Sequence, residues 1–247
     1  MRITLIEGKK IYFVSDHHFG FPTLSCSLER EEKFISWLTH IKTDIQVLFL
    51  LGDFFDFWFK FKKHPSNEFI EIKKNFIELQ EQGIEIYFFS GNHDIYIKDY
   101  FKKELGIKSF HKGQLIILNQ KKWFITHGDP PLLRALLDNR LSCFLFPILY
   151  KIGVMKVIKY FLFKRKQREK NKQMASFSKK RLLSYAKKKS KKINYDFLIM
   201  GHIHSPLSLS LDKKQLICIG DWLYHFSYAF FDGEDLKIDV FNKVDTN

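Results

Sequence analysis

The stretch Val-Leu-Phe-Leu-Leu-Gly-Asp-Phe-Phe-Asp, residues 47–56, places five apolar residues directly before a glycine and a carboxylate. A short, continuous apolar run that ends at a glycine is typical of a strand buried on both faces of a sheet. Polar residues after such a strand lie at its carboxyl end, where open α/β sheets bind their ligands. The stretch therefore predicts a central strand that leads into a functional loop carrying Asp53 and Asp56.

Four other segments share this design, because each is short and polar and directly follows an apolar run. They are Asp16-His17-His18, Gly91-Asn92-His93-Asp94, His127-Gly128-Asp129 and Gly201-His202-Ile203-His204. The five segments supply carboxylate, imidazole and amide groups but no thiolate, a set that suits Mn²⁺, Fe or Zn²⁺. Two such cations ~3.5–4 Å apart can clamp a phosphoryl group and activate water, so the set points to phosphate-ester chemistry.

The rest of the chain indicates how these segments are brought together. Apolar residues at helical spacing predict helices over 29–41 and 67–82, between the apolar runs 11–14, 47–51 and 84–89. Runs that alternate with helices indicate parallel strands covered by helices. Further strands are expected over 115–118, 123–126 and 196–200, with hairpins over 207–219 and 226–241. We expect an α/β fold, a two-sheet α/β/β/α sandwich, formed as a single domain by residues 1–247.

Residues 131–192 interrupt this pattern, since they lack strand signals and read as a helical insertion. Residues 141–163 are strongly apolar, but Pro147 and three lysines interrupt them, which argues against a membrane-spanning helix. The apolar face either lines an acyl pocket or membrane surface, or packs on the core as a helical hairpin. We expect a lid over the loops described above.

Charge is concentrated in the same region. The chain carries a net charge of +14, while residues 151–192 alone hold 17 Lys or Arg and one acid, Glu169. A basic patch of this kind indicates nucleic acid, anionic lipid or a phosphorylated substrate, although a general excess of Lys also contributes. Three scattered cysteines and the lack of a signal-peptide pattern predict a cytoplasmic protein without disulfides.

The five segments, in this order, resemble the calcineurin-like metallophosphoesterase superfamily. The resemblance implies two metal sites that share Asp53, and it leaves His17 outside the ligand positions. The implied metal ligands are Asp16, His18, Asp53, Asn92, His127, His202 and His204. His93, with Asp94 behind it, is implied as the catalytic pair that assists the leaving group. Asp56 and Asp129 are expected to orient histidines rather than bind metal.

Finer features resemble the UDP-2,3-diacylglucosamine hydrolases of lipid A synthesis. These features are the Asp-Phe-Trp at 56–58, the Gly-Asp-Trp at 220–222 and the helical insertion. This resemblance implies hydrolysis of a glycolipid pyrophosphate to UMP and a diacylated sugar phosphate, with Mn²⁺ as the expected metal. It also implies peripheral association with the anionic inner face of the inner membrane. The expected substrate-binding residues are Asn92, His93, Arg168, Asn171 and His202.

Two other functions remain open at this point. One is a dinuclear-metal phosphodiesterase that acts on nucleotides or nucleic acid, with 151–192 as its basic platform. Nucleic-acid sites usually interleave aromatic and basic residues. In the most basic part, residues 164–192, aromatic residues are sparse, namely Phe177 and Tyr185, so nucleic acid is not the expected partner. The other is an inactive scaffold of the same fold, which the complete ligand set argues against. The oligomeric state is not predicted.

Overall fold

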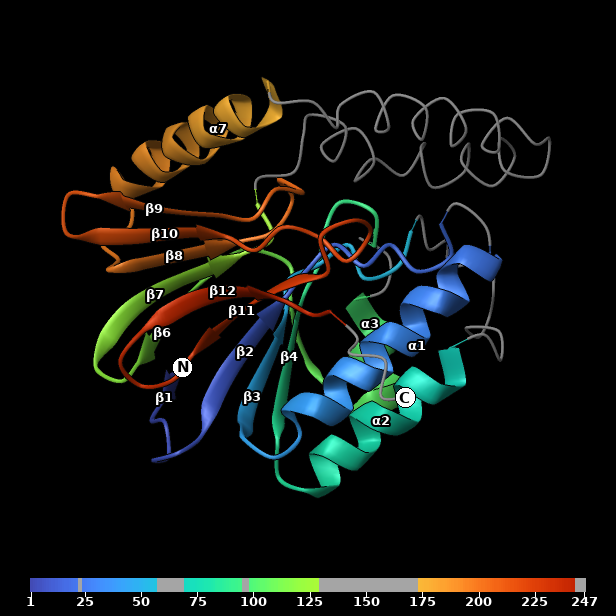
Figure 1. Ribbon diagram of the computed structural model, residues 1–247. Helices are drawn as coiled ribbons and strands as arrows, with labels where there is room; N and C mark the ends of the chain where they lie inside the picture. The colour runs from blue at the N-terminus through green and yellow to red at the C-terminus, as the bar shows by residue number, and fades with distance from the viewer. Residues whose placement is uncertain (22–23, 57–68, 95–97, 129–172, 243–247) are drawn as a thin grey trace.

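Two six-stranded sheets pack face to face, with helices on both outer sides (Figure 1). The computed structural model describes residues 1–21, 24–56, 69–94, 98–128 and 173–242. The described layers are, in order, three helices, one sheet, the second sheet and one helix. The predicted α/β/β/α sandwich is therefore confirmed.

The first sheet has the order β12-β11-β2-β3-β4-β5, and β2 to β5 are parallel to one another. Its strands are β2 (Lys10–Val14), β3 (Ile45–Leu50), β4 (Glu85–Phe89), β5 (Lys108–Phe110), β11 (Ser227–Phe231) and β12 (Leu236–Val240). The helices α1 (Leu24–Ile41), α2 (Ile70–Glu81) and α3 (Lys98–Leu105) cover its outer face. The parallel strands predicted from the apolar runs are thus observed.

The second sheet has the order β1-β6-β7-β8-β10-β9, in which β7, β8 and β10 are parallel. Its strands are β1 (Arg2–Ile3), β6 (Gln114–Leu118), β7 (Lys121–Thr126), β8 (Phe197–Met200), β9 (Leu207–Leu211) and β10 (Lys214–Cys218). Helix α7 (Gln173–Ser190) lies across its outer face (Figure 1) and buries Leu182 and Ala186 against Leu198 and Leu216.

Successive side chains of a strand point to opposite faces, so each central strand contributes to two cores. In β3, Leu48 and Leu50 pack under the helices, whereas Val47 and Phe49 pack between the sheets. All four are at most 1% exposed, which explains why the run is apolar without alternation. Burial on both faces fixes the register of β3, and with it the position of the loop that carries Asp53.

The predicted elements differ from the observed ones mainly at their ends. Both hairpins are confirmed, as β9–β10 and β11–β12. Helix α1 begins at Leu24 rather than at residue 29, and α2 spans Ile70–Glu81 rather than 67–82. The sequence analysis missed α3, in which Phe101 and Leu105 are buried among the side chains that are described, and the short strands β1 and β5. Few buried residues make a weak periodic signal.

The predicted insertion is described in part. Helix α7 occupies Gln173–Ser190, whereas residues 131–172, including the apolar stretch 141–163, lie outside the described residues. Among the helices that the structure describes, none has both the length and the apolar character needed to cross a bilayer.

Candidate metal centre

The described residues of all five polar segments lie where a strand ends, as the apolar runs before them predict. The loops after β2, β3 and β4 leave one sheet, and the loops after β7 and β8 leave the other. The loops interlock through main-chain hydrogen bonds, since the amides of Asp16 and His18 donate to the carbonyl oxygens of Gly52 and Asp53 over 3.0 and 2.9 Å. The parallel strands therefore bring residues from five distant parts of the chain to one place.

The loops have an unusual backbone at the side chains of interest. Asp16, His18, Asp53 and His202 have φ angles of +57°, +48°, +50° and +68°. Such left-handed conformations are uncommon outside glycine and concentrate at functional sites, where the surrounding structure holds them in place. Four of the seven predicted ligands are thus held in a conformation that an isolated chain would rarely adopt.

Glycines allow these loops to pack against one another. A Cβ atom added to Gly91 would overlap Asp53, and one added to Gly201 would overlap Ser15 and lie 2.7 Å from Oδ2 of Asp16. Gly52 has φ +83°, and its added Cβ would lie 2.5 Å from the amide nitrogen of Gly91. The glycines in the motifs therefore provide space for the carboxylates.

One cluster consists of Asp16, His18 and His204, whose ligand atoms lie within 4.8 Å of one another. Oδ2 of Asp16 accepts hydrogen bonds from Ser15 Oγ and the amide of His202, over 2.6 and 2.8 Å. Its Oδ1 is buried and accepts no hydrogen bond among the described residues. It lies 3.4 Å from Nε2 of His204 and 3.7 Å from Nε2 of His18.

A second cluster consists of Asp53, His127 and His202. Oδ2 of Asp53 lies 3.5 Å from Nε2 of His127 and 3.7 Å from Nε2 of His18, so this oxygen faces both clusters. Asn92 joins the second cluster, with Oδ1 3.2 Å from Nε2 of His127. The main-chain oxygen of Leu51 lies 2.6 Å from Nδ1 of His127 and directs Nε2 into the site.

His93 lies beside both clusters, and its partner is Asp56. Nδ1 of His93 is 2.8 Å from Oδ1 of Asp56, and the same oxygen lies 3.5 Å from Nδ1 of His18. The sequence predicts Asp94 behind His93, but the carboxylate of Asp94 accepts the main-chain N–H groups of Gly91 and Phe54 instead. Asp94 therefore ties two loops together, while Asp56 orients two histidines as predicted.

The pKa values of the site residues are shifted because buried charged groups lie close together. Burial opposes ionisation of Asp53, but the neighbouring His127 and His93 outweigh this effect and hold the pKa of Asp53 well below its usual value. Burial likewise lowers the pKa of His127, but the carboxylates of Asp53 and Asp16 raise it to about 10. Burial and the charge of Asp53 raise the pKa of Asp94 to about 7. Protons and cations compete for such ligands.

His17 is enclosed in the core next to the site. It is 1% exposed, and neither ring nitrogen has a hydrogen-bond partner among the described residues. Its ring lies 4.6 Å from that of Phe34, 4.7 Å from that of Phe54 and 5.7 Å from that of Trp222. Burial lowers the pKa of His17 well below its usual value. His17 therefore packs in the core and belongs to neither metal cluster.

The sequence analysis missed two residues that support the site. Asp221 is fully buried, and its Oδ2 lies 3.1 Å from Nδ1 of His204. Arg30 is 8% exposed and donates from Nη2 to the main-chain oxygen of His18 over 3.1 Å. The Gly-Asp-Trp at 220–222 was a signal for the first residue. Arg30 lies in a helix rich in charged residues, where nothing in the sequence distinguishes it.

Three predicted side chains, Asp129, Arg168 and Asn171, lie outside the described residues. The seven predicted metal ligands and His93 all lie within the described site. The clusters suit divalent cations, because Oδ1 of Asp16 is a buried carboxylate oxygen without a hydrogen-bond donor, facing two imidazole nitrogens. Carboxylate, imidazole and amide ligands match the donors that such cations take.

A two-sheet α/β sandwich that gathers these groups at the ends of its strands is the architecture of a metal-dependent phosphoesterase. Comparison with known proteins agrees, since the model of the calcineurin-like phosphoesterase family matches residues 9–206. The chain belongs to the calcineurin-like phosphoesterase family and is a metal-dependent hydrolase of phosphate esters.

The sequence similarity to known relatives extends over almost the whole chain. The UDP-2,3-diacylglucosamine hydrolase of Porphyromonas gingivalis is 29% identical over 255 residues, which cover 93% of this chain and 97% of the relative. The enzyme of the same name from Haemophilus influenzae is 25% identical and covers 89% and 93%, respectively. A solved archaeal phosphodiesterase superposes with a TM-score of 0.50 at 18% identity, over 94% of this chain and 99% of its own. That last likeness concerns the fold alone.

Proposed function

We propose that the protein hydrolyses the pyrophosphate of UDP-2,3-diacylglucosamine to UMP and 2,3-diacylglucosamine 1-phosphate, a step of lipid A biosynthesis. The observation that carries this proposal is the similarity to hydrolases of that name over nearly the full length of both chains. The metal centre supports it, because a pyrophosphate is a substrate on which two cations act together.

We assign the ligands of two divalent cations, most simply Mn²⁺, from the two clusters. Asp16, His18 and His204 hold one cation together with Asp53, and Asp53 also serves the other. The second set is Asp53, Asn92, His127 and His202. Bound divalent metals stabilise charge on a phosphoryl group and lower the pKa of bound water.

We assign to His93 the role of assisting the leaving group. Asp56 holds Nδ1 of His93 over 2.8 Å, and Nε2 points toward the clusters, 3.9 Å from Oδ2 of Asp53. When its ring is protonated, a side chain held in this way presents the N–H of Nε2 to a leaving phosphate oxygen. Asp94 supports the reaction by joining the loops of Asn92 and Asp53 through main-chain hydrogen bonds. Asn92, His93 and His202 also border the place that the substrate phosphate would occupy.

Residues 131–192 are proposed as a lid in which Arg168 and Asn171 bind the substrate. The first turns of α7 support this, because Ser178 is 2% exposed and its Oγ lies 3.3 Å from Oγ of Ser205. Ser205 directly follows His204. The helix that ends the proposed lid therefore contacts the loop of the metal centre.

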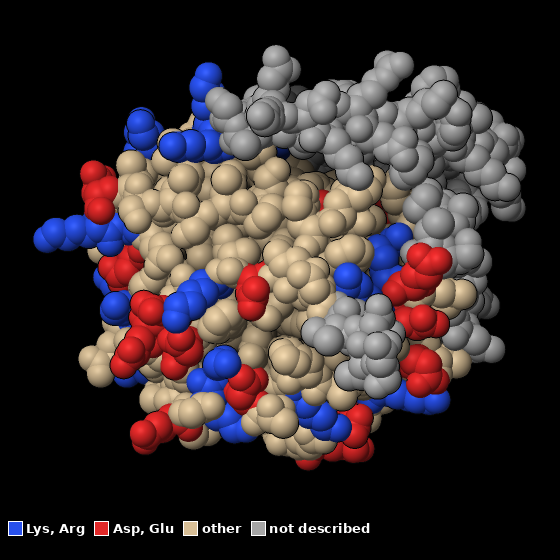
Figure 2. Space-filling model, viewed as in Figure 1, with Lys and Arg blue, Asp and Glu red and all other residues tan. Residues whose placement is uncertain are grey.

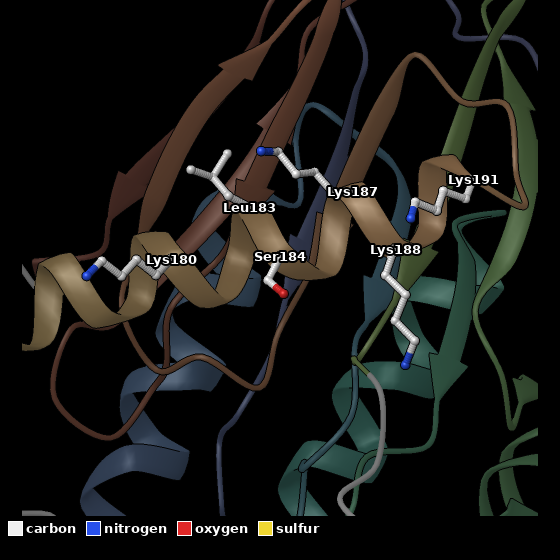
Figure 3. Close-up of a pocket in the computed structure, with 6 residues that line it drawn as sticks. All are labelled: Lys180, Leu183, Ser184, Lys187, Lys188 and Lys191. Carbon is white, nitrogen blue, oxygen red and sulfur yellow. The ribbon is translucent and has the colours of Figure 1, made fainter.

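The outer side of α7 supports association with an anionic membrane surface. Lys180, Lys187, Lys188 and Lys191, with Leu183 and Ser184, line a concavity of about 480 Å³ (Figure 3). Their spacing of three and four residues places them on one helical face. Basic side chains gather over α7, whereas the lower part of the same view mixes both signs (Figure 2). Each lysine near an anionic bilayer contributes roughly 1 kcal/mol to binding.

The reaction is tested with UDP-2,3-diacylglucosamine in detergent and Mn²⁺, with UMP release as the measurement. Asp53→Asn should lose both bound Mn²⁺ and UMP release, by more than the ~10–100-fold seen for supporting groups. Asp212→Asn, in an exposed hairpin turn with φ +55°, is the matched control. Absence of UMP, with rapid turnover of a soluble nucleotide diester, would contradict the proposed substrate.

The membrane proposal has its own test. Lys180→Glu with Lys187→Glu should weaken sedimentation with vesicles that contain anionic phospholipid at least about tenfold. The double variant Lys102→Glu with Lys112→Glu removes equal charge from exposed positions elsewhere. Equal loss in both double variants would show that net charge, rather than the α7 surface, controls binding.

A further inference from the structure

Asp221 lies in the connection between β10 and β11, and its carboxylate is surrounded by donors. Oδ1 accepts the main-chain N–H groups of Leu223, Tyr224 and His225 over 3.2, 2.8 and 3.0 Å. Oδ2 lies 3.1 Å from Nδ1 of His204. The side chain is fully buried, so these contacts are not exchanged for contacts with bulk water.

This environment determines where the proton of His204 lies. A carboxylate among N–H donors only accepts, so Nδ1 of His204 must carry a hydrogen to bond with Oδ2. In a neutral imidazole, Nε2 then has a free lone pair. Nε2 of His204 faces Oδ1 of Asp16 at 3.4 Å, and two acceptors at this distance repel each other unless a cation lies between them.

The connection between β10 and β11 also contacts Asp16, another ligand of this cluster. The main-chain amide of Trp222 donates to the main-chain oxygen of Asp16 over 3.2 Å. Among the described residues, no hydrogen bond or ion pair joins Asp221 to Asp53, His127 or His202. The influence of Asp221 is thus directed at one of the two clusters.

We propose that Asp221 is a positioning residue that holds His204 in the Nδ1–H tautomer and thereby sets cation affinity at the Asp16, His18 and His204 cluster. The inference rests on the proposed two-metal centre, but it is independent of which phosphate ester is the substrate. The second cluster retains its own support, because the carbonyl oxygen of Leu51 orients His127.

Asp221→Asn tests the proposal, because it changes the hydrogen-bonding groups of the side chain but hardly changes its volume. If the asparagine oxygen keeps the three main-chain donors, its NH₂ group faces Nδ1 of His204 and forces the hydrogen onto Nε2, where no cation then binds. If the amide rotates, its oxygen keeps the Nδ1–H of His204, but its NH₂ group then faces three main-chain N–H donors. The first arrangement keeps three hydrogen bonds and the second only one, so the first should dominate and the support for His204 is lost. Partners of this kind typically change metal affinity ~10–100-fold.

The matched control is Asp232→Asn. Asp232 also accepts two main-chain N–H groups, from Glu234 and Asp235 over 3.1 and 2.8 Å, but it lies in the β11–β12 turn. Mn²⁺ titration of the full chain should show one of two sites weakened ~10–100-fold in Asp221→Asn and neither weakened in Asp232→Asn. In a His204→Ala background, Asp221→Asn should have no further effect on Mn²⁺ affinity, because the two changes act on one interaction.

A second measurement does not depend on the variant folding. Long-range ¹H–¹⁵N spectra of the metal-free wild-type protein should show His204 with its hydrogen on Nδ1. A hydrogen on Nε2 alone, or equal weakening of both Mn²⁺ sites in Asp221→Asn, would overturn the inference. If wild type binds two Mn²⁺ ions and Asp221→Asn weakens one, but UDP-2,3-diacylglucosamine is not cleaved, the substrate proposal fails and the role of Asp221 stands.

Discussion

Arg30 in α1 donates a hydrogen bond from Nη2 to the main-chain carbonyl oxygen of His18 over 3.1 Å. The same nitrogen contacts the carbonyl oxygen of Phe21. A cationic side chain from the helical layer therefore holds both ends of the segment that follows the first ligand motif. His18 has φ +48°, so this segment needs such support to keep its conformation.

Replacing Arg30 should weaken both the fold and the metal centre. Arg30→Met keeps the apolar stem but removes the donors, and hydrogen bonds from charged groups contribute ~1.5–3 kcal/mol each. We expect the free energy of unfolding to fall by about 2–4 kcal/mol in urea denaturation. Arg2→Met, at an exposed position, should change it by less than ~0.5 kcal/mol. An Arg30→Met protein as stable as wild type would refute this role.

Gly91→Ala should reduce metal binding through steric overlap. The added Cβ would overlap Asp53, whose Oδ2 faces both clusters, so Mn²⁺ should bind more weakly at both. Gly83→Ala is the control, since it has φ +81° but nothing within 4 Å of its added Cβ. That variant should lose ~1–2 kcal/mol of stability from backbone strain with unchanged Mn²⁺ affinity. Calorimetric titration separates the two effects.

His17→Phe should raise the free energy of unfolding by about 1 kcal/mol. It removes two buried ring nitrogens that have no hydrogen-bond partner among the described residues, and an unsatisfied buried polar group costs ~1–3 kcal/mol. The slightly larger ring offsets part of that gain. His17→Asn should be less stable, because it leaves a cavity and a polar group. Loss of Mn²⁺ in His17→Phe would assign the ring to the metal centre instead.

Metal removal should lower the melting temperature. Ligands that bind only the folded state stabilise it, by about 2.7 kcal/mol for one site at a free concentration of 100 times Kd. For a chain of this size we expect a rise of roughly 5–10 °C per filled site on adding Mn²⁺ after chelation. Scanning fluorimetry measures the shift. Asp53→Asn should show no such rise, and an equal rise there would place the binding sites elsewhere.

The central strands and their loops were predictable because their signal is local. Five apolar residues before Gly52 indicate burial on both faces, and the polar residues after them lie at the strand end. Elements with few buried residues gave no such signal, which is why α3 and β5 were missed. The start of α1 was predicted five residues late because periodicity marks the buried face, and that face first becomes regular after the helix has begun.

The sequence by itself determined the kind of chemistry, because residue type and order along the chain specify the donors that five strand ends can offer. Only the tertiary structure decided how these donors are used. In the folded protein, Asp56 contacts His93, and Asp94 accepts hydrogen bonds from the main chains of two loops. Asp221 contacts His204, and Arg30 donates to the carbonyl oxygen of His18. Those pairings join residues separated by 3 to 40 positions. They depend on packing and on the left-handed turns at the strand ends, and residue spacing encodes neither.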